Sequence, residues 1–275
     1  MKNNNLHIGQ LPELRIVTSE SIIFHEQPDR NISEKLVTKI TQDGFLKNPP
    51  IVGKTTTGEY ILLDGANRTN ALIRMDIKHI CVQTINMDDP LLTVSAWSHA
   101  IEGSIRDQLL QCLDRLGVAY LEQSSISNKN VNLAEVVFKN GAVLAIPRLA
   151  TLPKNISLLH SITKLYLHQG RMDRVSYYRL GDLIRNYKDF SALFSYAEIE
   201  KTELVKIALS GEKMPSGITR IQLPKRVLNF NIPIDVLAAN KSLLEKNNWL
   251  NNNILERKRA NSIRFYREPT FIFDD

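Results

Sequence analysis

A six-residue segment in the first third of the chain carries residue types that suit phosphate binding, with Asp64 and Gly65 at its start and Arg68 one turn later. It follows an apolar run over residues 60–63 and opens a stretch of good helix formers with apolar spacing of about 3.6 residues. The first turn of a helix presents unpaired N–H groups and a partial positive charge, and glycine lets the backbone approach a ligand. The predicted phosphate-binding residues are Gly65, Ala66, Asn67, Arg68 and Thr69.

The carboxylate of Asp64 stands at the tip of the predicted strand and can face the same point. A carboxylate in that place could bind a metal ion or take a proton. The segment also fits a plain Asp-Gly turn, in which Asp64 caps the helix and Arg68 forms an ion pair at the surface. The residues alone leave both interpretations open.

Apolar runs and turn signals in the first ninety residues predict a small sheet with two helices. The first helix is expected to begin with Ser33 as its cap and to stop at Gly44, and the second follows Gly65 and ends near residue 75. The expected strands cover residues 14–17, 21–24, 51–52, 60–63 and 80–85, with a hairpin turn at 57–59 and a loop at 45–50.

After residue 90 the pattern becomes more helical, with a boundary expected near residues 88–103. The expected helices cover residues 91–99, 104–116, 156–167, 174–187, 196–209 and 234–254. The expected strands cover residues 134–138 and 142–146, which a hairpin joins, and residues 217–223 and 227–230. The predicted fold class is therefore α+β, with one domain over residues 1–90 and a second over residues 91–275.

Composition and sequence pattern argue against a globally disordered chain and against a membrane-spanning protein. Of 275 residues, 43% are apolar and 23% are charged, which is typical of a folded globular protein. The sequence predicts no membrane span and no signal peptide, and the two cysteines, Cys81 and Cys112, have no metal-like spacing, so a cytoplasmic location is expected. The net charge of +6 permits a polyanionic partner without requiring one.

Several segments, found in the same order along nearly the whole chain, resemble one family. They are His25-Glu26, residues 44–52 (Gly-Phe-Leu-Lys-Asn-Pro-Pro-Ile-Val), Asp64-Gly65-x-x-Arg68, residues 95–99 (Ser-Ala-Trp-Ser-His), residues 211–220 (Gly-Glu-Lys-Met-Pro-Ser-Gly-Ile-Thr-Arg), residues 226–229 and residues 232–234. The first ninety residues are similar to the ParB/sulfiredoxin-like fold. The whole set resembles the free L-serine kinases of that superfamily, most closely the branch that works in staphyloferrin B siderophore synthesis.

Three positions separate the branches of this superfamily. Sulfiredoxins carry a cysteine after the glycine of the motif, and this chain has Ala66, which excludes their redox chemistry. Chromosome-partitioning ParB proteins have a second arginine where this chain has Asn70. The free serine kinases have histidine where this chain has Asn67, so a role of that histidine in the chemistry is not carried over.

The resemblance implies roles for residues that the pattern alone would leave on the surface or in the core. Glu26 matches the essential glutamate of the kinases and would take the proton of the acceptor hydroxyl, and Asp64 would be the second catalytic acid and the ligand of Mg²⁺. Without the resemblance, Glu26 would be a loop acid and Trp97 a core residue. The expected substrate-binding residues are Trp97, His99, Thr219, Arg220 and Arg226, with Arg220 the best candidate to hold a carboxylate.

The implied architecture is a ParB/sulfiredoxin-like N-terminal domain with a C-terminal α+β domain packed on it, and the active site in the cleft between them. The implied reaction is phosphorylation of free L-serine to O-phospho-L-serine, with ATP or ADP as donor and Mg²⁺ as cofactor. The product would supply a downstream pyridoxal-phosphate enzyme in a siderophore-precursor or cysteine pathway. The alternative is a nucleotide-binding, ParB-like DNA-binding transcriptional regulator, for which nucleic acid would be the partner.

Overall fold

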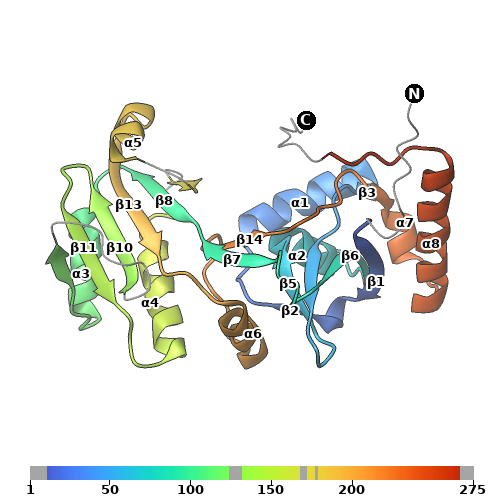
Figure 1. Cartoon of the computed structure of the whole chain (residues 1–275), viewed down its shortest axis with the longest axis horizontal. Helices are drawn as coiled ribbons and strands as arrows, with labels where there is room; N and C mark the ends of the chain where they lie inside the picture. The colour runs from blue at the N-terminus through green and yellow to red at the C-terminus, as the bar shows by residue number, and fades with distance from the viewer. Residues whose placement is uncertain (1–10, 124–131, 168–171, 177–178, 267–275) are drawn as a thin grey trace.

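The computed structural model describes residues 11–123, 132–167, 172–176 and 179–266. The elements form a mixed α+β architecture, as predicted, in which two larger sheets lie side by side along the long axis (Figure 1). Two short two-stranded ribbons complete the sheets of these ranges. Within the same ranges, none of the helices is both long and apolar enough to cross a membrane.

The first sheet has five strands in the order β1-β6-β4-β5-β2. The strands are β1 (Glu13–Thr18), β2 (Ile22–Phe24), β4 (Ile51–Lys54), β5 (Tyr60–Asp64) and β6 (His79–Asn86). β2 runs parallel to β5, with Phe24 opposite Leu62, so both strands end at the same edge of the sheet. Because side chains alternate along a strand, Leu62 packs in one apolar cluster while Ile61 and Leu63 pack in another.

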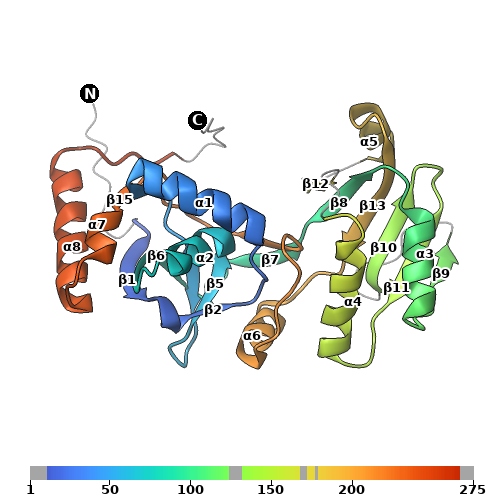
Figure 2. The ribbon, with the colours of Figure 1, turned by 180° about the vertical axis from the view of Figure 1, so that it is seen from behind.

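Two helices cover one face of this sheet, α1 (Arg30–Asp43) and α2 (Ala66–Arg74) (Figure 2). The carboxylate of Asp29 caps α1 by accepting the N–H of Ile32 at 2.9 Å. Ser33, the predicted cap, lies inside the helix instead, and its hydroxyl donates to the carbonyl oxygen of Asp29 at 2.7 Å. Gly44 ends the helix in a left-handed conformation with φ of +74°, as predicted.

The C-terminal segment of the chain returns to the first sheet. β15 (Ile232–Pro233) pairs with β3 (Phe45–Leu46), and α7 (Ile234–Ala238) and α8 (Leu243–Arg259) follow it. Leu237 and Leu250 are buried in the same apolar cluster as the strands of this sheet. A division of the chain at residue 90 would therefore separate these helices from the core on which they pack.

The second sheet has six strands in the order β12-β8-β13-β10-β11-β9. The strands are β8 (Ser98–Glu102), β9 (Leu121–Gln123), β10 (Asn132–Phe138), β11 (Val143–Pro147), β12 (Met172–Val175) and β13 (Phe190–Tyr196). The helices α3 (Arg106–Arg115) and α4 (Leu152–Lys164) share one apolar cluster on this sheet, while Leu183 of α5 (Leu180–Asn186) packs in a separate cluster with Leu193. Apolar clusters thus lie on both faces of the second sheet. This sheet with α3, α4 and α5 is the second unit of the molecule, and the first sheet with its helices is the first unit.

A two-stranded ribbon of β7 (Thr93–Ala96) and β14 (Thr219–Gln222) lies between the two sheets, with α6 (Lys201–Ser210) nearby (Figure 1). Thr219 pairs with Ala96, and the N–H of Trp97 donates to the carbonyl oxygen of Ile218 at 2.8 Å. The ribbon holds segments more than a hundred residues apart in sequence beside each other, next to the carboxyl end of β2.

Five predicted elements after residue 90 differ from the observed ones. Residues 91–99, expected as a helix, form β7 and the start of β8. The expected helix over 174–187 starts within β12, and among its described residues only those of α5 are helical; residues 196–209 are helical only from Lys201. Residues 227–230 form no strand, and 234–254 are divided between α7 and α8. Short apolar runs fit the periodicity of a helix as well as that of a strand, so long-range pairing decides their conformation.

Candidate active site

A cavity of about 460 Å³ lies where the first sheet faces the ribbon and the loop before it. Residues from five separate parts of the sequence line it, among them Glu26, Asp64, Arg68, Trp97, Arg174, Ser216, Gly217, Thr219 and Arg226. Two acids and three arginines therefore face one space. An arrangement of this kind suits an anionic ligand and a proton transfer.

Parallel pairing explains why the two acids meet. His25 and Glu26 follow the end of β2, and Asp64 is the last residue of β5, its parallel neighbour. The loop before β14 fixes the first pair from the other side: the N–H of Gln27 donates to the carbonyl oxygen of Met214, and the N–H of Met214 donates to that of His25, both at 2.8 Å. Glu26 is thus held between the two units.

His25, the residue before Glu26, is buried. Its Nδ1 donates to the carbonyl oxygen of Leu62 at 2.6 Å, and its Nε2 lies 3.2 Å from the hydroxyl of Thr219. Burial lowers the pKa of His25 to about 4, although the bond to Leu62 works in the opposite direction. The imidazole is therefore neutral at ordinary pH and bridges β5 to β14.

Glu26 has the electrostatic character of a general base. Burial raises the pKa of its carboxyl to about 7, against the opposing effects of the Gly217 N–H, the charge of Arg174 and the hydroxyls of Ser216 and Thr219. A carboxylate with a pKa near the working pH can accept a proton and release it again. The same hydrogen bonds fix the direction in which the carboxylate points.

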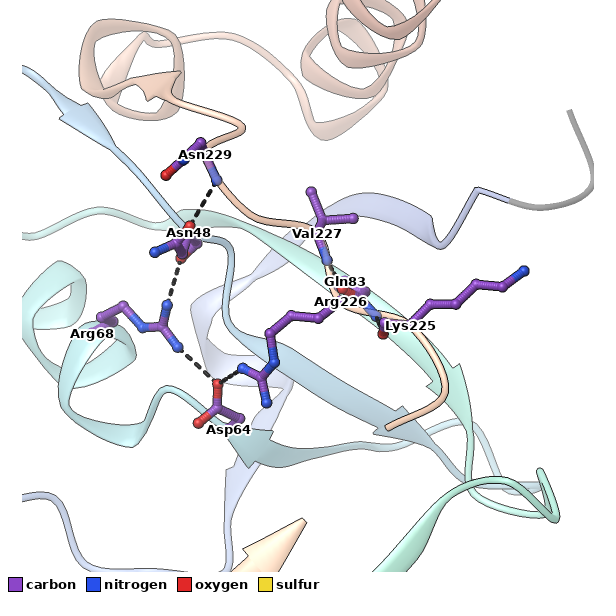
Figure 3. A network of polar contacts seen from close by, with 8 residues as sticks. All are labelled: Asn48, Asp64, Arg68, Gln83, Lys225, Arg226, Val227 and Asn229. Atoms are coloured by element: carbon purple, nitrogen blue, oxygen red, sulfur yellow. Dashed lines mark hydrogen bonds and ion pairs between the residues drawn. The ribbon is translucent and has the colours of Figure 1, made fainter. Parts of the chain in front are cut away.

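Asp64 is held by two arginines, and Figure 3 shows the network. The Nη2 of Arg68 donates to its Oδ2 at 2.9 Å, and Arg226 forms a second ion pair with the same oxygen. Burial alone would raise the pKa of Asp64, but Arg68 and Arg226 together hold it below the usual range. Asp64 is therefore ionised, and its two arginines carry positive charge toward the start of α2.

The start of α2 is built as the sequence predicts. Gly65 adopts a left-handed conformation with φ of +92°, and a Cβ added to it would come within 3.0 Å of the Arg68 guanidinium. Asn67, which stands where the free serine kinases have histidine, accepts the N–H of Asp29 through its Oδ1 at 2.7 Å. The first turn of α2 is thereby tied to the first turn of α1.

The segment that carries Arg226 is fastened to the first sheet by side-chain amides (Figure 3). Gln83 donates to the carbonyl oxygen of Lys225 at 2.9 Å and accepts the N–H of Val227 at 2.8 Å. Asn48 accepts the N–H of Asn229 through its side chain at 2.8 Å, while its carbonyl oxygen accepts from Arg68 at 3.1 Å. The three bonds to Lys225, Val227 and Asn229 fix the position from which Arg226 reaches Asp64.

Three of the predicted site residues lie outside the lining of the cavity. Thr69 is fully buried in α2. Arg220 lies on the opposite face of β14 from Thr219, with its guanidinium carbon 4.6 Å from the centre of the Trp97 ring. His99 is fully buried behind the cavity, where its Nε2 donates to the carbonyl oxygen of Gly217 at 2.9 Å.

Because side chains alternate along a strand, Arg220 lies on the face of β14 opposite to Thr219. The burial of His99 determines its protonation state. Burial lowers the pKa of His99 to about 4, in spite of its bond to Gly217. Its Nδ1 lies 2.8 Å from the hydroxyl of Tyr166, which in turn contacts the hydroxyl of Tyr196. His99 therefore supports the loop beneath Glu26 and does not face the cavity.

Sequence reasoning missed Arg174, Ser216 and Gly217 as lining residues. Arg174 was not predicted as a site residue because the spacing over residues 174–187 predicts a helix, whereas the residue lies on β12. Gly217 has φ of +83°, and the Pro-x-Gly turn before β14 was the signal that could have marked it.

The described residues contain no group of three or more metal-ligating side chains. Mg²⁺ is usually bound through one or two carboxylates together with substrate phosphates. The ionised carboxylate of Asp64, beside the start of α2, fits that mode because the phosphates would supply the remaining ligands.

Comparison with known proteins identifies a relative over nearly the full length of the chain. No family model matches the sequence. The ATP-dependent L-serine kinase SbnI of Staphylococcus aureus (strain NCTC 8325 / PS 47) is 21% identical over 288 residues, covering 98% of this chain and 99% of that protein.

Solved structures share the fold. A C-terminally truncated SbnI from Staphylococcus aureus superposes with a TM-score of 0.71 at 18% identity, covering 89% of this chain and 96% of that one. A free serine kinase in complex with ADP, with a glutamate replaced by alanine, gives 0.68 at 17% identity, covering 82% and 94%. A free serine kinase in complex with AMP gives 0.67 at 17% identity with the same coverage.

Proposed function

We propose that this protein is a free L-serine kinase, which transfers a phosphoryl group from a nucleotide to the hydroxyl of free L-serine and forms O-phospho-L-serine. The observation that carries the proposal is the convergence of Glu26, whose pKa is raised to about 7, and of Arg68 at the start of α2, on one cavity. The relatives, which are named as serine kinases and extend over nearly the whole chain, agree with this chemistry.

Glu26 acts as the general base in this proposal. The serine oxygen forms a bond to the γ-phosphorus of ATP, the bond from that phosphorus to the bridging oxygen breaks, and ADP leaves. The hydroxyl proton passes to the carboxylate of Glu26, which the N–H of Gly217 and the hydroxyls of Ser216 and Thr219 hold in place. A carboxylate with an ordinary pKa would be a weaker acceptor at neutral pH.

The N–H groups of α2 and the guanidinium of Arg68 bind the phosphates. In the free protein the carboxylate of Asp64 pairs with both Arg68 and Arg226. A bound phosphate would compete for these arginines, so the carboxylate of Asp64 becomes available as a ligand. Mg²⁺ bound there with the nucleotide would neutralise charge on the phosphates. The ribbon and the loop at 214–217 close the other side of the site.

ATP is the donor that the full-length relative favours, because that protein is described as ATP-dependent. ADP is the second candidate, because solved free serine kinases hold ADP or AMP. The remaining parts of the proposal are a cytoplasmic enzyme with a ParB/sulfiredoxin-like N-terminal domain, whose product supplies a pyridoxal-phosphate enzyme of siderophore or cysteine synthesis. A DNA-binding regulator is less well supported, since the relatives reported above are named as kinases.

The experiment that tests the proposal is an acceptor screen. The purified protein is incubated with Mg²⁺, with ATP or ADP, and with each free amino acid in turn, and phosphoamino acids are detected by mass. We expect phosphoserine with L-serine and little product with other amino acids. Phosphorylation of a different acceptor, or nucleotide consumption without any phosphoamino acid, would refute the proposal.

A further inference from the structure

Arg174 reaches the cavity from the second sheet, on the side away from α2. It lies on β12, where it pairs with His99 of β8. Its guanidinium packs directly on Gly217: a Cβ added to that glycine would come 2.2 Å from Nη2 and 2.6 Å from Cζ. A side chain at position 217 would displace the guanidinium from this place, and the φ of +83° also favours glycine there.

The charge of Arg174 is not neutralised by an acid of the described chain at ion-pair distance, whereas Arg68 and Arg226 are both paired with Asp64. Arg174 does act on Glu26 through space, since its charge opposes the rise in the pKa of that carboxyl. A cation that lines a cavity and lacks a close acidic partner is suited to bind an anionic group of a ligand.

The shape of a free amino acid indicates which anionic group this is. In serine only two carbons separate the hydroxyl oxygen from the carboxyl carbon, so a group that binds the carboxylate must lie close to the base that receives the hydroxyl proton. Arg174 and Glu26 line the same cavity and share Gly217 as a neighbour. Arg220, the residue expected from the sequence, instead stacks on Trp97 outside the lining.

We propose that Arg174 binds the α-carboxylate of the amino-acid substrate and thereby selects a free amino acid over a serine within a peptide. This inference rests on the proposed kinase function. A planar guanidinium can bind a carboxylate through two hydrogen bonds, and a serine residue in a peptide offers a neutral carbonyl in that place.

The test compares L-serine with L-serine amide in the wild-type protein and in Arg174→Ala. In the wild type, kcat/KM should favour serine over its amide. In Arg174→Ala, kcat/KM for serine should fall about 10- to 150-fold, the loss expected for a charged hydrogen bond, and the preference should disappear. The Kd for the nucleotide, measured by calorimetry, should stay the same. Arg174→Lys should keep part of the preference.

Two further variants serve as controls. Arg179→Ala removes an exposed arginine at the start of α5 and should behave as the wild type. Arg220→Ala tests the rival assignment directly. A preference for serine that persists in Arg174→Ala but is lost in Arg220→Ala would overturn the proposal in favour of Arg220.

Other outcomes also decide the question. Equal losses for serine and its amide would mean that Arg174 positions Glu26 and does not bind substrate, and a weaker nucleotide Kd would assign Arg174 to the phosphates. If the wild type forms no phosphoserine and binds no serine in calorimetry, the proposed function fails together with this inference. If the wild type makes phosphoserine and Arg174→Ala keeps its preference, the inference alone fails.

Discussion

The raised pKa of Glu26 comes from its position after a buried strand and not from its residue type alone. The loop at residues 214–217 covers it, and burial raises its pKa to about 7 against four opposing interactions. An exposed glutamate would have an ordinary pKa and would be a poor acceptor for a serine proton at neutral pH. The bridge to Met214 is therefore part of the catalytic design that we propose.

We predict that Glu26→Gln retains nucleotide binding and loses phosphoryl transfer. Glutamine keeps the size of the side chain but cannot accept the proton, and loss of a general base typically slows catalysis roughly 10²- to 10⁴-fold. Calorimetry with the nucleotide and a phosphoserine assay measure the two properties separately. Near-normal turnover would show that Glu26 is not the base.

The pH dependence of activity should report the same carboxyl group. Glu26 must be ionised to act as base, so kcat/KM should rise with pH and level off above about 7, the pKa of this group. His25, with a pKa of about 4, stays neutral over this range and adds no second step. A profile that is flat from pH 5 to 8 would argue against Glu26 as the base. Because the charge of Arg174 lowers the pKa of Glu26, Arg174→Ala should move the midpoint of the profile to higher pH.

The position of a single residue could be predicted from the sequence where a short motif contains both the residue and the side chain that pairs with it. Asp64 and Arg68 are four residues apart on one turn, and they meet at 2.9 Å. Arg174 could not be found in this way, because its place in the cavity depends on the pairing of β12 with β8. The place of Arg220 outside the cavity lining could not be predicted, because the motif does not say which face of β14 the residue occupies.

Helix α2 joins the two phosphate-binding features that we propose, a free N-terminus and an arginine in its first turn. Its start is anchored on one side by Asn67 bonding to Asp29, and on the other by Arg68 bonding to the carbonyl oxygen of Asn48. This anchoring means that a ligand would find the N–H groups already in place.

Arg68→Ala should weaken nucleotide binding more than serine binding. A charged hydrogen bond contributes about 1.5–3 kcal/mol, so the nucleotide Kd should rise by roughly 10- to 150-fold. Calorimetry with each ligand measures the difference. Arg74→Ala removes an exposed arginine at the other end of α2, where it pairs with Glu34, and serves as the control. An unchanged nucleotide Kd in Arg68→Ala would leave this arginine with a structural role only.

A buried chain of hydrogen bonds stabilises the loop beneath Glu26. The carbonyl oxygen of Gly217 can only accept, so His99 carries its proton on Nε2, and the neutral Nδ1 must accept from Tyr166. The hydroxyl of Tyr196 then donates to that of Tyr166. Strand β8, the turn after helix α4 and strand β13 are thus connected behind the cavity.

Tyr166→Phe should destabilise the protein by about 1–3 kcal/mol, because it leaves Nδ1 of His99 buried without a donor. Tyr196→Phe should cost less, since Tyr166 still donates to His99 in that variant. Urea unfolding of the two variants measures the difference. Equal losses in both would contradict the direction of donation that we assign.

Most elements of the first ninety residues could be predicted because local signals specify them; the exception is β3 within the expected loop at 45–50, which forms by pairing with the distant β15. The Asp-Gly turn at 64–65 and the glycine at position 44 mark helix ends that the structure confirms. Beyond residue 90 the signals are weaker, and β7 and β14 form a ribbon across 123 residues of sequence, as the pairing of Ala96 with Thr219 shows. Local spacing cannot encode a partner so distant.

The molecule as a whole brings together five parts of the chain that are far apart in sequence. Residues within 24–36, 62–68 and 216–226 line one cavity together with Trp97 and Arg174. The C-terminal helices pack on the first sheet, so the chain passes from that sheet to the second and back again. Because the acids come from one sheet and Arg174 from the other, the substrate selection that we propose depends on the two sheets being held together.

The most direct test of this account is to follow the phosphoryl group itself in a single turnover. The wild-type protein is mixed with ATP labelled at the γ-phosphate, Mg²⁺ and L-serine, and the label is traced among ATP, inorganic phosphate and phosphoserine, with Glu26→Gln run in parallel. We predict that the label moves to the hydroxyl oxygen of serine in the wild type and stays on the nucleotide in the variant. Release of the label as inorganic phosphate, with none on serine from ATP or from ADP labelled at the β-phosphate, would contradict the account.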